Sequence, residues 1–318
     1  MTKLHRLPLL LGQALLASLL LMFFLAPAAL AQQEREYEDL ALTGDGACTR
    51  CHDELEYVPV LSIAKTAHGT VADGRTPTCT SCHGASTAHI DNPEGTSQRP
   101  PVDRLFGLAS DTPVHEQNSA CLDCHQGGER IHWQGSAHDS NEVACASCHE
   151  LHTQDDKVRN RQEQPEVCFA CHKEQRMEVT RFSRHPIPEG KVICSDCHNA
   201  HGTAGPKLLT RDSVTDTCYQ CHAEKRGPFI WNHQPVNEDC SNCHNPHGTN
   251  IAGMLKWRTP FLCQQCHESR SHQGVIPEMN QPGFGTGEAL ARSCLNCHTN
   301  IHGGNSPTNR PDARSLRR

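Results

Sequence analysis

The sequence predicts a mostly irregular chain of short α-helices with little or no β-structure, built from repeated small units instead of one large side-chain core. Aromatic residues make up 4% of the 318 residues and the mean hydropathy is −0.60, which is too little apolar material for a conventional core. The chain also holds 23 glycines and 20 prolines, which indicate many turns. Its 20 cysteines and 23 histidines argue against a disordered chain and suggest that something bound by these side chains fills the interior.

The first 31 residues have the three parts of a secretory signal peptide. Lys3 and Arg6 give a positive start, an apolar run reaches Leu25, and the small-residue site 29–31 predicts cleavage after Ala31. An uncleaved membrane anchor is the alternative, because the apolar stretch already begins at Leu7. Since this is the only long apolar run, a bundle of membrane-spanning helices is excluded. The signal predicts export from the cytoplasm.

The charge of the exported chain argues against nucleic acid as a partner. The signal removes two of the 29 basic residues and none of the 36 acidic ones, so 27 basic residues remain and the formal charge is −9. Residues 32–47 form an acidic lead-in, and residues 303–318 form a flexible basic tail. The predicted functional domain spans residues 48–302.

Every cysteine belongs to one motif, Cys-x-x-Cys-His, which occurs ten times and leaves no cysteine over. This motif attaches c-type haem: two thiols form thioethers with the porphyrin, and the histidine that follows ligates the iron. The predicted thioether cysteines are Cys48, Cys51, Cys79, Cys82, Cys121, Cys124, Cys145, Cys148, Cys168, Cys171, Cys194, Cys197, Cys218, Cys221, Cys240, Cys243, Cys263, Cys266, Cys294 and Cys297. The predicted proximal ligands are His52, His83, His125, His149, His172, His198, His222, His244, His267 and His298.

Zinc sites and disulfides account less well for this pattern. Zinc explains a Cys-x-x-Cys pair, and disulfides suit an exported chain, but neither requires a histidine after every second cysteine. Ten haem c groups in an exported chain of 287 residues would form much of the interior, which accounts for the missing core. The chain without haem is then not expected to fold.

The remaining histidines follow a two-motif period. When the motifs are taken in consecutive pairs, one histidine lies between the two motifs of each pair and another follows the second motif. The predicted distal ligands are His68, His89, His138, His152, His185, His201, His233, His247, His272 and His302. A histidine three residues after a proximal ligand cannot reach the far side of the same ring, so it is expected to ligate a neighbouring haem. The pattern therefore predicts five two-haem repeats in an elongated wire.

Two histidines and three methionines stand outside this pattern. His115 and His132 are interpreted as surface or haem-edge residues, although His132 is an alternative to His89, whose offset from its motif is irregular. The methionines of the exported chain recur at no fixed offset, so they are not expected to ligate iron. The longest gap between motif starts, 42 residues from Cys79 to Cys121, is rich in proline and predicts a long loop or hinge.

The segments 131–138, 194–202 and 294–305 resemble the decahaem periplasmic cytochromes of the MtrA/DmsE type. The resemblance covers residues 48–304 and implies bis-histidine haems in two pentahaem-like halves, with a boundary near 173–193. It also implies a periplasmic protein held at the outer membrane by a β-barrel porin. Its redox partners would be a periplasmic or inner-membrane cytochrome and an extracellular multihaem cytochrome or other terminal donor or acceptor. Five two-haem units do not divide into two equal halves, so the third unit would straddle this boundary.

Three functions compete for such a chain. The resemblance favours an electron conduit between periplasm and cell exterior, that is, extracellular electron transfer by an electron-transfer protein and not an enzyme. A soluble periplasmic electron shuttle is the alternative. A multihaem reductase needs an open iron site, whereas all ten motifs end in histidine and distal candidates are in surplus.

Overall fold

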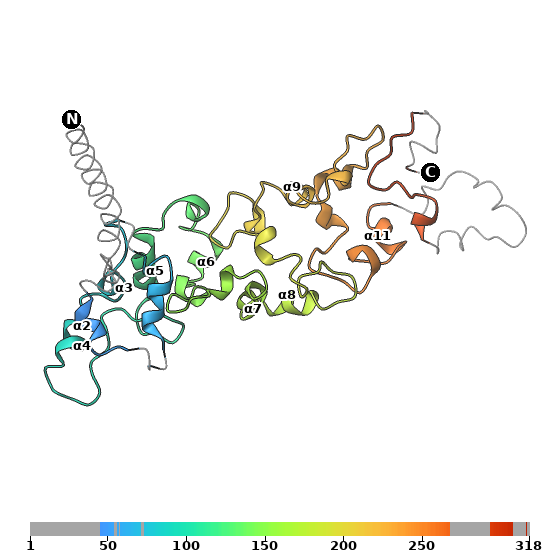
Figure 1. Cartoon of the computed structure of the whole chain (residues 1–318). Coiled ribbons are helices and arrows are strands. Elements are labelled where there is room, and N and C mark those ends of the chain that lie inside the picture. The colour runs from blue at the N-terminus through green and yellow to red at the C-terminus, as the bar shows by residue number, and fades with distance from the viewer. Residues whose placement is uncertain are drawn as a thin grey trace, which may run out of the picture.

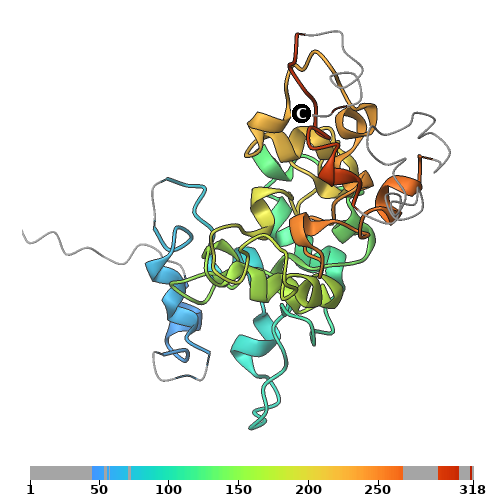
Figure 2. The same ribbon diagram turned by 90° about the vertical axis from the view of Figure 1, so that its right-hand side faces the viewer.

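The computed structural model describes residues 45–53, 56, 58–70, 73–267, 293–307 and 316. The signal peptide, most of the acidic lead-in and nearly all of the tail beyond residue 307 lie outside these residues. The described chain is elongated, and its segments follow one another from one end of the molecule to the other in sequence order (Figure 1). In the view turned by 90°, the middle and C-terminal segments overlap because the long axis points partly toward the viewer (Figure 2).

The described helices are short, and the longest, α5, has nine residues. The α-helices are α2 Gly46–Thr49, α3 Cys79–His83, α4 Thr87–Asp91, α5 Val114–Leu122, α6 Ala137–Ser140, α7 Gln164–Phe169, α8 Lys173–Glu178, α9 Val214–Tyr219, α10 Gln234–Glu238 and α11 Phe261–Gln264. The 3-10 helices are η1 Val60–Lys65, η2 Gly128–Arg130, η3 Cys145–Ser147, η4 Lys157–Arg159, η5 Cys194–Asp196, η6 Pro206–Leu208, η7 Ala223–Lys225, η8 Cys240–Asn242, η9 Ala252–Met254 and η11 Cys294–Asn296. No strand occurs in the described ranges, where pairing is limited to isolated bridges such as Ser183 with Thr249. The predicted fold class is confirmed.

The local structure around the motifs alternates with a period of two. We number the motifs from one to ten in chain order. From the third motif onward, each odd-numbered motif begins near the end of an α-helix, as in α5, α7, α9 and α11. Each even motif instead forms a 3-10 turn, in η3, η5, η8 and η11. The helices have ordinary start signals: Ser213 caps α9 by accepting from the N–H of Asp216, and Pro165 lies in the first turn of α7. The second motif is the exception, because it lies inside α3.

A buried polar side chain joins the two motifs of each of the first four pairs. The Oδ1 of Asn118 in α5 accepts from the N–H of Cys145 at 2.8 Å, and Nδ2 of Asn118 donates to the carbonyl of Val143. Gln164 in α7 and Thr215 in α9 make the equivalent contacts with Ser195 and with the carbonyl of Glu238. Asp45 accepts from the N–H of Cys79 in the first pair. These contacts make each pair of motifs a structural unit.

Segments that follow the even motifs tie each unit to the preceding one. Thr249 pairs with Ser183 as an antiparallel bridge, and Trp231 pairs with Gly304 in the same way. Gly202 lies against the backbone of His132 so closely that a Cβ would collide with that carbonyl. Gly248 lies in the same way against the carbonyl of Glu178. Both glycines have positive φ angles, +107° and +142°, which other residues rarely adopt.

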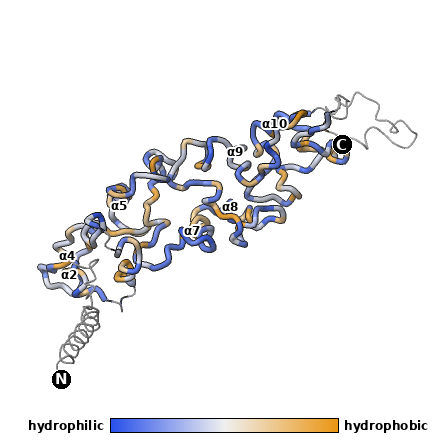
Figure 3. Tube along the Cα trace, turned by 45° about the horizontal axis from the view of Figure 1, so that its top comes forward, coloured by the Kyte–Doolittle hydropathy of each residue, from blue (hydrophilic) through white to orange (hydrophobic). Residues whose placement is uncertain are grey.

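The described chain has a small side-chain core. Its one cluster of buried apolar residues contains Phe169, Val179 and Ile187, with Val192 packed against it. Hydrophobic residues otherwise occur in short stretches along the whole trace (Figure 3). No helix in the described ranges is long and apolar enough to cross a membrane. Residues 92–113 form the predicted long loop between α4 and α5.

Candidate haem-binding sites

Each motif folds into a single turn that brings its three functional side chains together. In nine motifs the N–H of the histidine donates to the carbonyl of the first cysteine, at 2.9–3.1 Å, and the second motif lies within α3. This is the hydrogen bond of one α-helical turn, so residues one, four and five share one face. The spacing therefore presents two thiols and one imidazole to the same group.

The imidazole rings face one another in nine pairs, with ring centroids 5.8–6.3 Å apart. Every pair joins one motif histidine to one of the predicted distal histidines. The pairs are His52–His89, His83–His152, His125–His68, His149–His201, His172–His138, His198–His247, His222–His185, His244–His302 and His267–His233. Two imidazoles that share a metal ion, each with a bond of about 2 Å, have centroids about 6 Å apart. The spacing fits an iron atom between the rings.

The pairing interlocks the units. A histidine that follows an even motif faces the even motif of the preceding unit, as His201 faces His149 and His247 faces His198. A histidine between two motifs faces the odd motif of the next unit, as His185 faces His222. The histidine three residues after a proximal ligand therefore serves the motif two positions earlier, not an adjacent one. His89 departs from the rule because it faces His52 in its own unit.

The remaining histidines lie apart from these pairs. His272 is outside the described residues, so its position relative to His298 in the tenth motif stays a prediction. The side chain of His115 is 82% exposed beside Glu116, and His132 is also exposed. Within the described ranges neither ring forms a pair, which agrees with the surface interpretation.

Backbone carbonyls orient many of the paired rings. In seven histidines the Nδ1 atom lies 2.7–3.0 Å from a carbonyl oxygen, where it can only donate. These are His83, His89, His138, His152, His185, His198 and His244. With the proton on Nδ1, the Nε2 lone pair is available for a metal, which is the arrangement that orients histidine ligands in metal sites.

Buried N–H groups next to the paired rings suit a group that carries carboxylates. Trp133 is 7% exposed, its ring lies beside that of His201, and its Nε1 has no acceptor in the described part of the chain. The Nε atoms of Arg130 and Arg184 are also buried and also have no acceptor in the described part of the chain. Buried donors are nearly always satisfied, and haem carries two propionates that can accept from them. Both the facing histidines and the buried N–H donors around them therefore fit haem.

Burial keeps several paired histidines ready to bind metal. It lowers the pKa of His83, His198, His201 and His302 below the ordinary value for histidine. For His201 the nearby ring of His149 and the guanidinium of Arg130 lower the pKa further. A ring with a lowered pKa is neutral at neutral pH, which is the form that ligates iron.

The cysteines form a continuous line from the first motif to the tenth. Within a unit the first cysteines of both motifs are neighbours: the thiol of Cys121 donates a hydrogen bond to Cys145, which raises the pKa of Cys121 and lowers that of Cys145. Between units the second cysteines are neighbours: burial and then the thiol of Cys171 raise the pKa of Cys148. The same two contacts alternate along the chain through Cys48–Cys79, Cys82–Cys124, Cys168–Cys194, Cys197–Cys221, Cys218–Cys240, Cys243–Cys266 and Cys263–Cys294. Attachment points that are neighbours in sequence are therefore neighbours in space.

Two family models match parts of the chain. The doubled CXXCH motif matches residues 185–227 and 233–272, and the NrfB-like cytochrome c-type protein model matches residues 79–164. The doubled-motif matches pair the sixth motif with the seventh and the eighth with the ninth, one motif out of phase with the units defined above. Each match instead encloses a pair of facing histidines; for example, His185 and His222 both lie within the match to residues 185–227.

Related proteins give the same result, in one case over most of the chain. The multiheme cytochrome MtrA of Shewanella baltica is 42% identical over 277 residues, which cover 83% of this chain and 80% of the relative. The cytochrome c-type protein NrfB of Escherichia coli is 31% identical over 47% of this chain and 77% of the relative, and NrfB of Haemophilus influenzae is 32% identical over 40% and 64%. With its haem-attachment motifs, facing histidines and length of match, the chain belongs to the MtrA family of multihaem c-type cytochromes, which transfer electrons and bind haem c through these motifs.

Proposed function

We propose that the chain carries ten haem c groups, each held by two thioethers and two histidines, and conducts electrons along its length. The nine facing pairs supply the ligands of nine irons, and His298 with His272 completes the tenth site. Bound haem supplies one-electron chemistry, for which the chain provides attachment, axial ligands and low-dielectric surroundings.

The observation that carries this proposal is the unbroken line of cysteine neighbours from Cys48 to Cys294. Each haem edge is fixed where its thioethers are, so neighbouring attachment points bring neighbouring porphyrin edges together. The interlocked histidines hold this order rigid, because each unit supplies ligands to the next. A line without gaps is what electron transfer over the whole molecule requires.

We further propose that the protein works at the outer membrane inside a β-barrel porin. A compact globule of 287 residues would be about 50 Å wide, and an elongated one is longer, whereas a bilayer with its headgroups is about 40–45 Å thick. The exported chain has a formal charge of −9 and hydrophobic residues only in short stretches, so a polar-lined barrel is the suitable enclosure. Its redox partners would be a periplasmic or inner-membrane cytochrome on one side and an extracellular cytochrome or other terminal donor or acceptor on the other.

Vesicles test this proposal directly. The haem-loaded protein is copurified with any porin from outer membranes and reconstituted into vesicles that hold a sealed redox dye. An external reductant should reduce the dye only when cytochrome and porin are both present, and vesicles with porin alone are the control. If no barrel copurifies and electrons move only between freely diffusing proteins, the soluble periplasmic shuttle is correct.

A further inference from the structure

Two carboxylates with little solvent exposure contact the rings of facing histidines. The Oδ2 of Asp156 lies 2.7 Å from Nδ1 of His149, and the Asp156 side chain is 14% exposed. The Oε2 of Glu178 lies 3.3 Å from Nδ1 of His247, and the Glu178 side chain is 10% exposed. These rings belong to the His149–His201 and His198–His247 pairs, near the middle of the line.

The equivalent rings in other units meet neutral carbonyls. His83, His198 and His244 occupy the same motif position as His149, and their Nδ1 atoms donate to backbone carbonyls at 3.0, 2.9 and 2.7 Å. The sites thus share one design and differ in the charge of the acceptor. A carboxylate also lies beside His52, on Glu56, but these side chains are 37% and 35% exposed, so solvent screens that charge more.

The charge of the acceptor changes the ligand. An imidazole that donates to a carboxylate becomes more basic at Nε2 than one that donates to a carbonyl. A more basic ligand, with a buried negative charge behind it, stabilises ferric iron over ferrous iron because the ferric state has one more positive charge. A carboxylate partner therefore lowers the reduction potential of its site.

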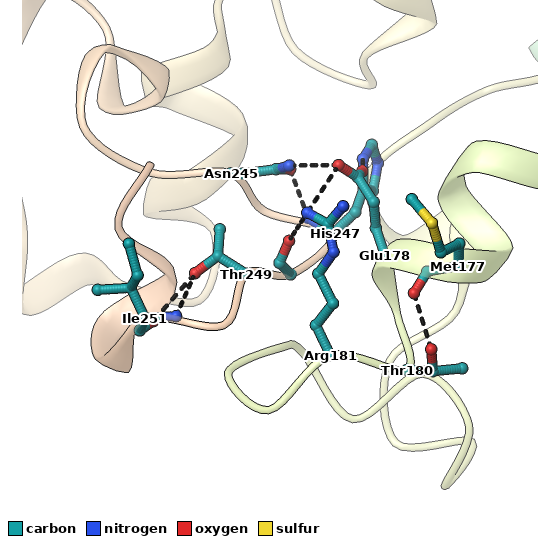
Figure 4. Close-up of polar contacts among 9 residues, drawn as sticks. Met177, Glu178, Thr180, Arg181, Asn245, His247, Thr249 and Ile251 are labelled. Carbon is teal, nitrogen blue, oxygen red and sulfur yellow. Dashed lines mark hydrogen bonds and ion pairs between the residues drawn. The ribbon is translucent and has the colours of Figure 1, made fainter. Parts of the chain in front are cut away.

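The two carboxylates are not equivalent. Asp156 makes the shorter contact, and its other oxygen accepts from the N–H of Glu150 at 3.3 Å. The charge of Asp156 also reaches the motif itself, since it contributes to raising the pKa of Cys148 after burial and Cys171. The Oε1 of Glu178, by contrast, accepts from Asn245 at 2.6 Å and contacts Arg181 at 3.5 Å (Figure 4). The guanidinium offsets part of the charge of Glu178, so Asp156 has the larger effect.

We propose that Asp156, acting through His149, lowers the reduction potential of the site built on the fourth motif. Glu178 acts on the sixth-motif site through His247 in the same way but more weakly. Both are positioning residues that tune ligands, and the proposal rests on the bis-histidine ligation proposed above. An electron that moves along the line is therefore held less favourably at the fourth site than it would be with a neutral acceptor in place of Asp156.

The test is Asp156→Asn in the haem-loaded full chain, because asparagine still accepts a hydrogen bond but carries no charge. Potentiometric titration monitored by electron paramagnetic resonance should show that one of the ten low-spin components has a higher reduction potential and changed g values. Glu150→Gln is the matched control: it removes a neighbouring charge that is 54% exposed and pairs with Lys157, and it should leave that component nearly in place. Superimposable titrations of Asp156→Asn and Glu150→Gln would overturn the proposal.

Glu178→Gln provides a second, independent reading if Asp156→Asn assembles poorly. It should raise the potential of a different component by a smaller amount, and an unmoved component would count against the proposal. Iron content and spin state are measured on the same samples. Loss of low-spin haem in the unmodified protein would contradict the shared ligation, whereas intact low-spin haem with unmoved potentials contradicts only the tuning by these carboxylates.

Discussion

At the residue scale, one four-residue segment serves three sites. In the segment 198–201, His198 faces His247 and His201 faces His149. The carbonyl of Ala200 between them accepts from Nδ1 of His138, which faces His172. The segment 244–247 repeats this arrangement, with the carbonyl of Pro246 accepting from His185. A substitution in such a segment therefore acts on a site whose motif is distant in sequence.

We expect His201→Ala to open the site of the fourth motif and not that of the sixth. His201 faces His149, so its loss leaves that iron with one protein ligand, whereas His198 keeps His247. Magnetic spectra of the oxidised protein should show one high-spin iron per chain. His115→Ala should leave the spectrum unchanged, because that ring is 82% exposed. A high-spin signal from His115→Ala, or none from His201→Ala, would contradict the pairing.

The sequence predicted the site residues better than it predicted their partners. The two-motif period selected the nine histidines that the structure places opposite motif histidines, because these positions recur with the repeat, and their role as iron ligands stays a prediction. It could not say that His201 reaches the fourth motif, since that contact depends on how units lie against each other. Backbone carbonyls such as that of Ala200 leave no mark in the sequence, and Asp156 looks like any surface carboxylate until its burial is known.

At the scale of single elements, buried polar side chains hold the two motifs of a unit together. Asn118 satisfies both the N–H of Cys145 and the carbonyl of Val143, and it is 4% exposed. Asn118→Ala removes the partner of two partly buried backbone groups, which costs about 1 kcal/mol for each lost hydrogen bond. We expect a lower unfolding temperature by circular dichroism of the haem-loaded protein. Ser119→Ala on the exposed side of α5 should change it little, and equal effects would contradict this role of Asn118.

The contact between successive units can be tested with two glycines. A Cβ at position 248 would meet the carbonyl of Glu178 and Cβ of Arg184, whereas nothing lies within 4 Å of one at position 253. Both residues have positive φ, but Gly253 (φ +70°, ψ +18°) lies in the left-handed region that alanine can adopt, whereas the φ of +142° at Gly248 is confined to glycine, so backbone strain adds to the clash at position 248. The additional clash should make Gly248→Ala less stable by about 1–3 kcal/mol. Denaturant unfolding of both variants measures the difference, and equal stabilities would show that the two segments do not press together.

Composition predicted short helices, turns and the absence of long strands, but not the alternation between odd and even motifs. The motif itself is the same in both positions, so the difference comes from the residues before it. An α-helix leads into Cys218, and a 3-10 turn begins at Cys240. A polar residue lies three or four positions before the first cysteine of the odd-numbered motif, as at Asn118 and Gln164, and hydrogen-bonds to the backbone of the next motif. This mark of the odd-numbered motifs was not identified from the sequence.

At the scale of the whole molecule, the bound groups must supply most of the core. The cluster of Phe169, Val179 and Ile187 is small for a chain of this length. We expect the chain without haem to lack a compact fold, because the facing rings would have nothing between them. Small-angle scattering and near-ultraviolet circular dichroism should show an expanded chain, with the haem-loaded protein as control. Cooperative unfolding of a compact haem-free chain would contradict this expectation.

The elongated arrangement follows from the contacts between the described units, which join each unit to the next one in the line. The division into two pentahaem-like halves near 173–193 stays a prediction. That boundary lies inside the third unit, where Gln164 in α7 accepts from the N–H of Ser195 in the sixth motif. A two-haem repeat therefore describes the local contacts more directly than a pair of halves.

Counting the irons and determining their spin states shows whether every motif carries a haem with two histidine ligands. The intact mass of the denatured protein gives the number of covalently bound haems, and electron paramagnetic resonance of the oxidised protein gives the ligation of each iron. We predict ten attached haems per chain, all low-spin, because the sequence holds ten motifs and ten predicted distal histidines. A mass that corresponds to fewer than nine haems, or a stoichiometric high-spin signal from an open iron site, would contradict it.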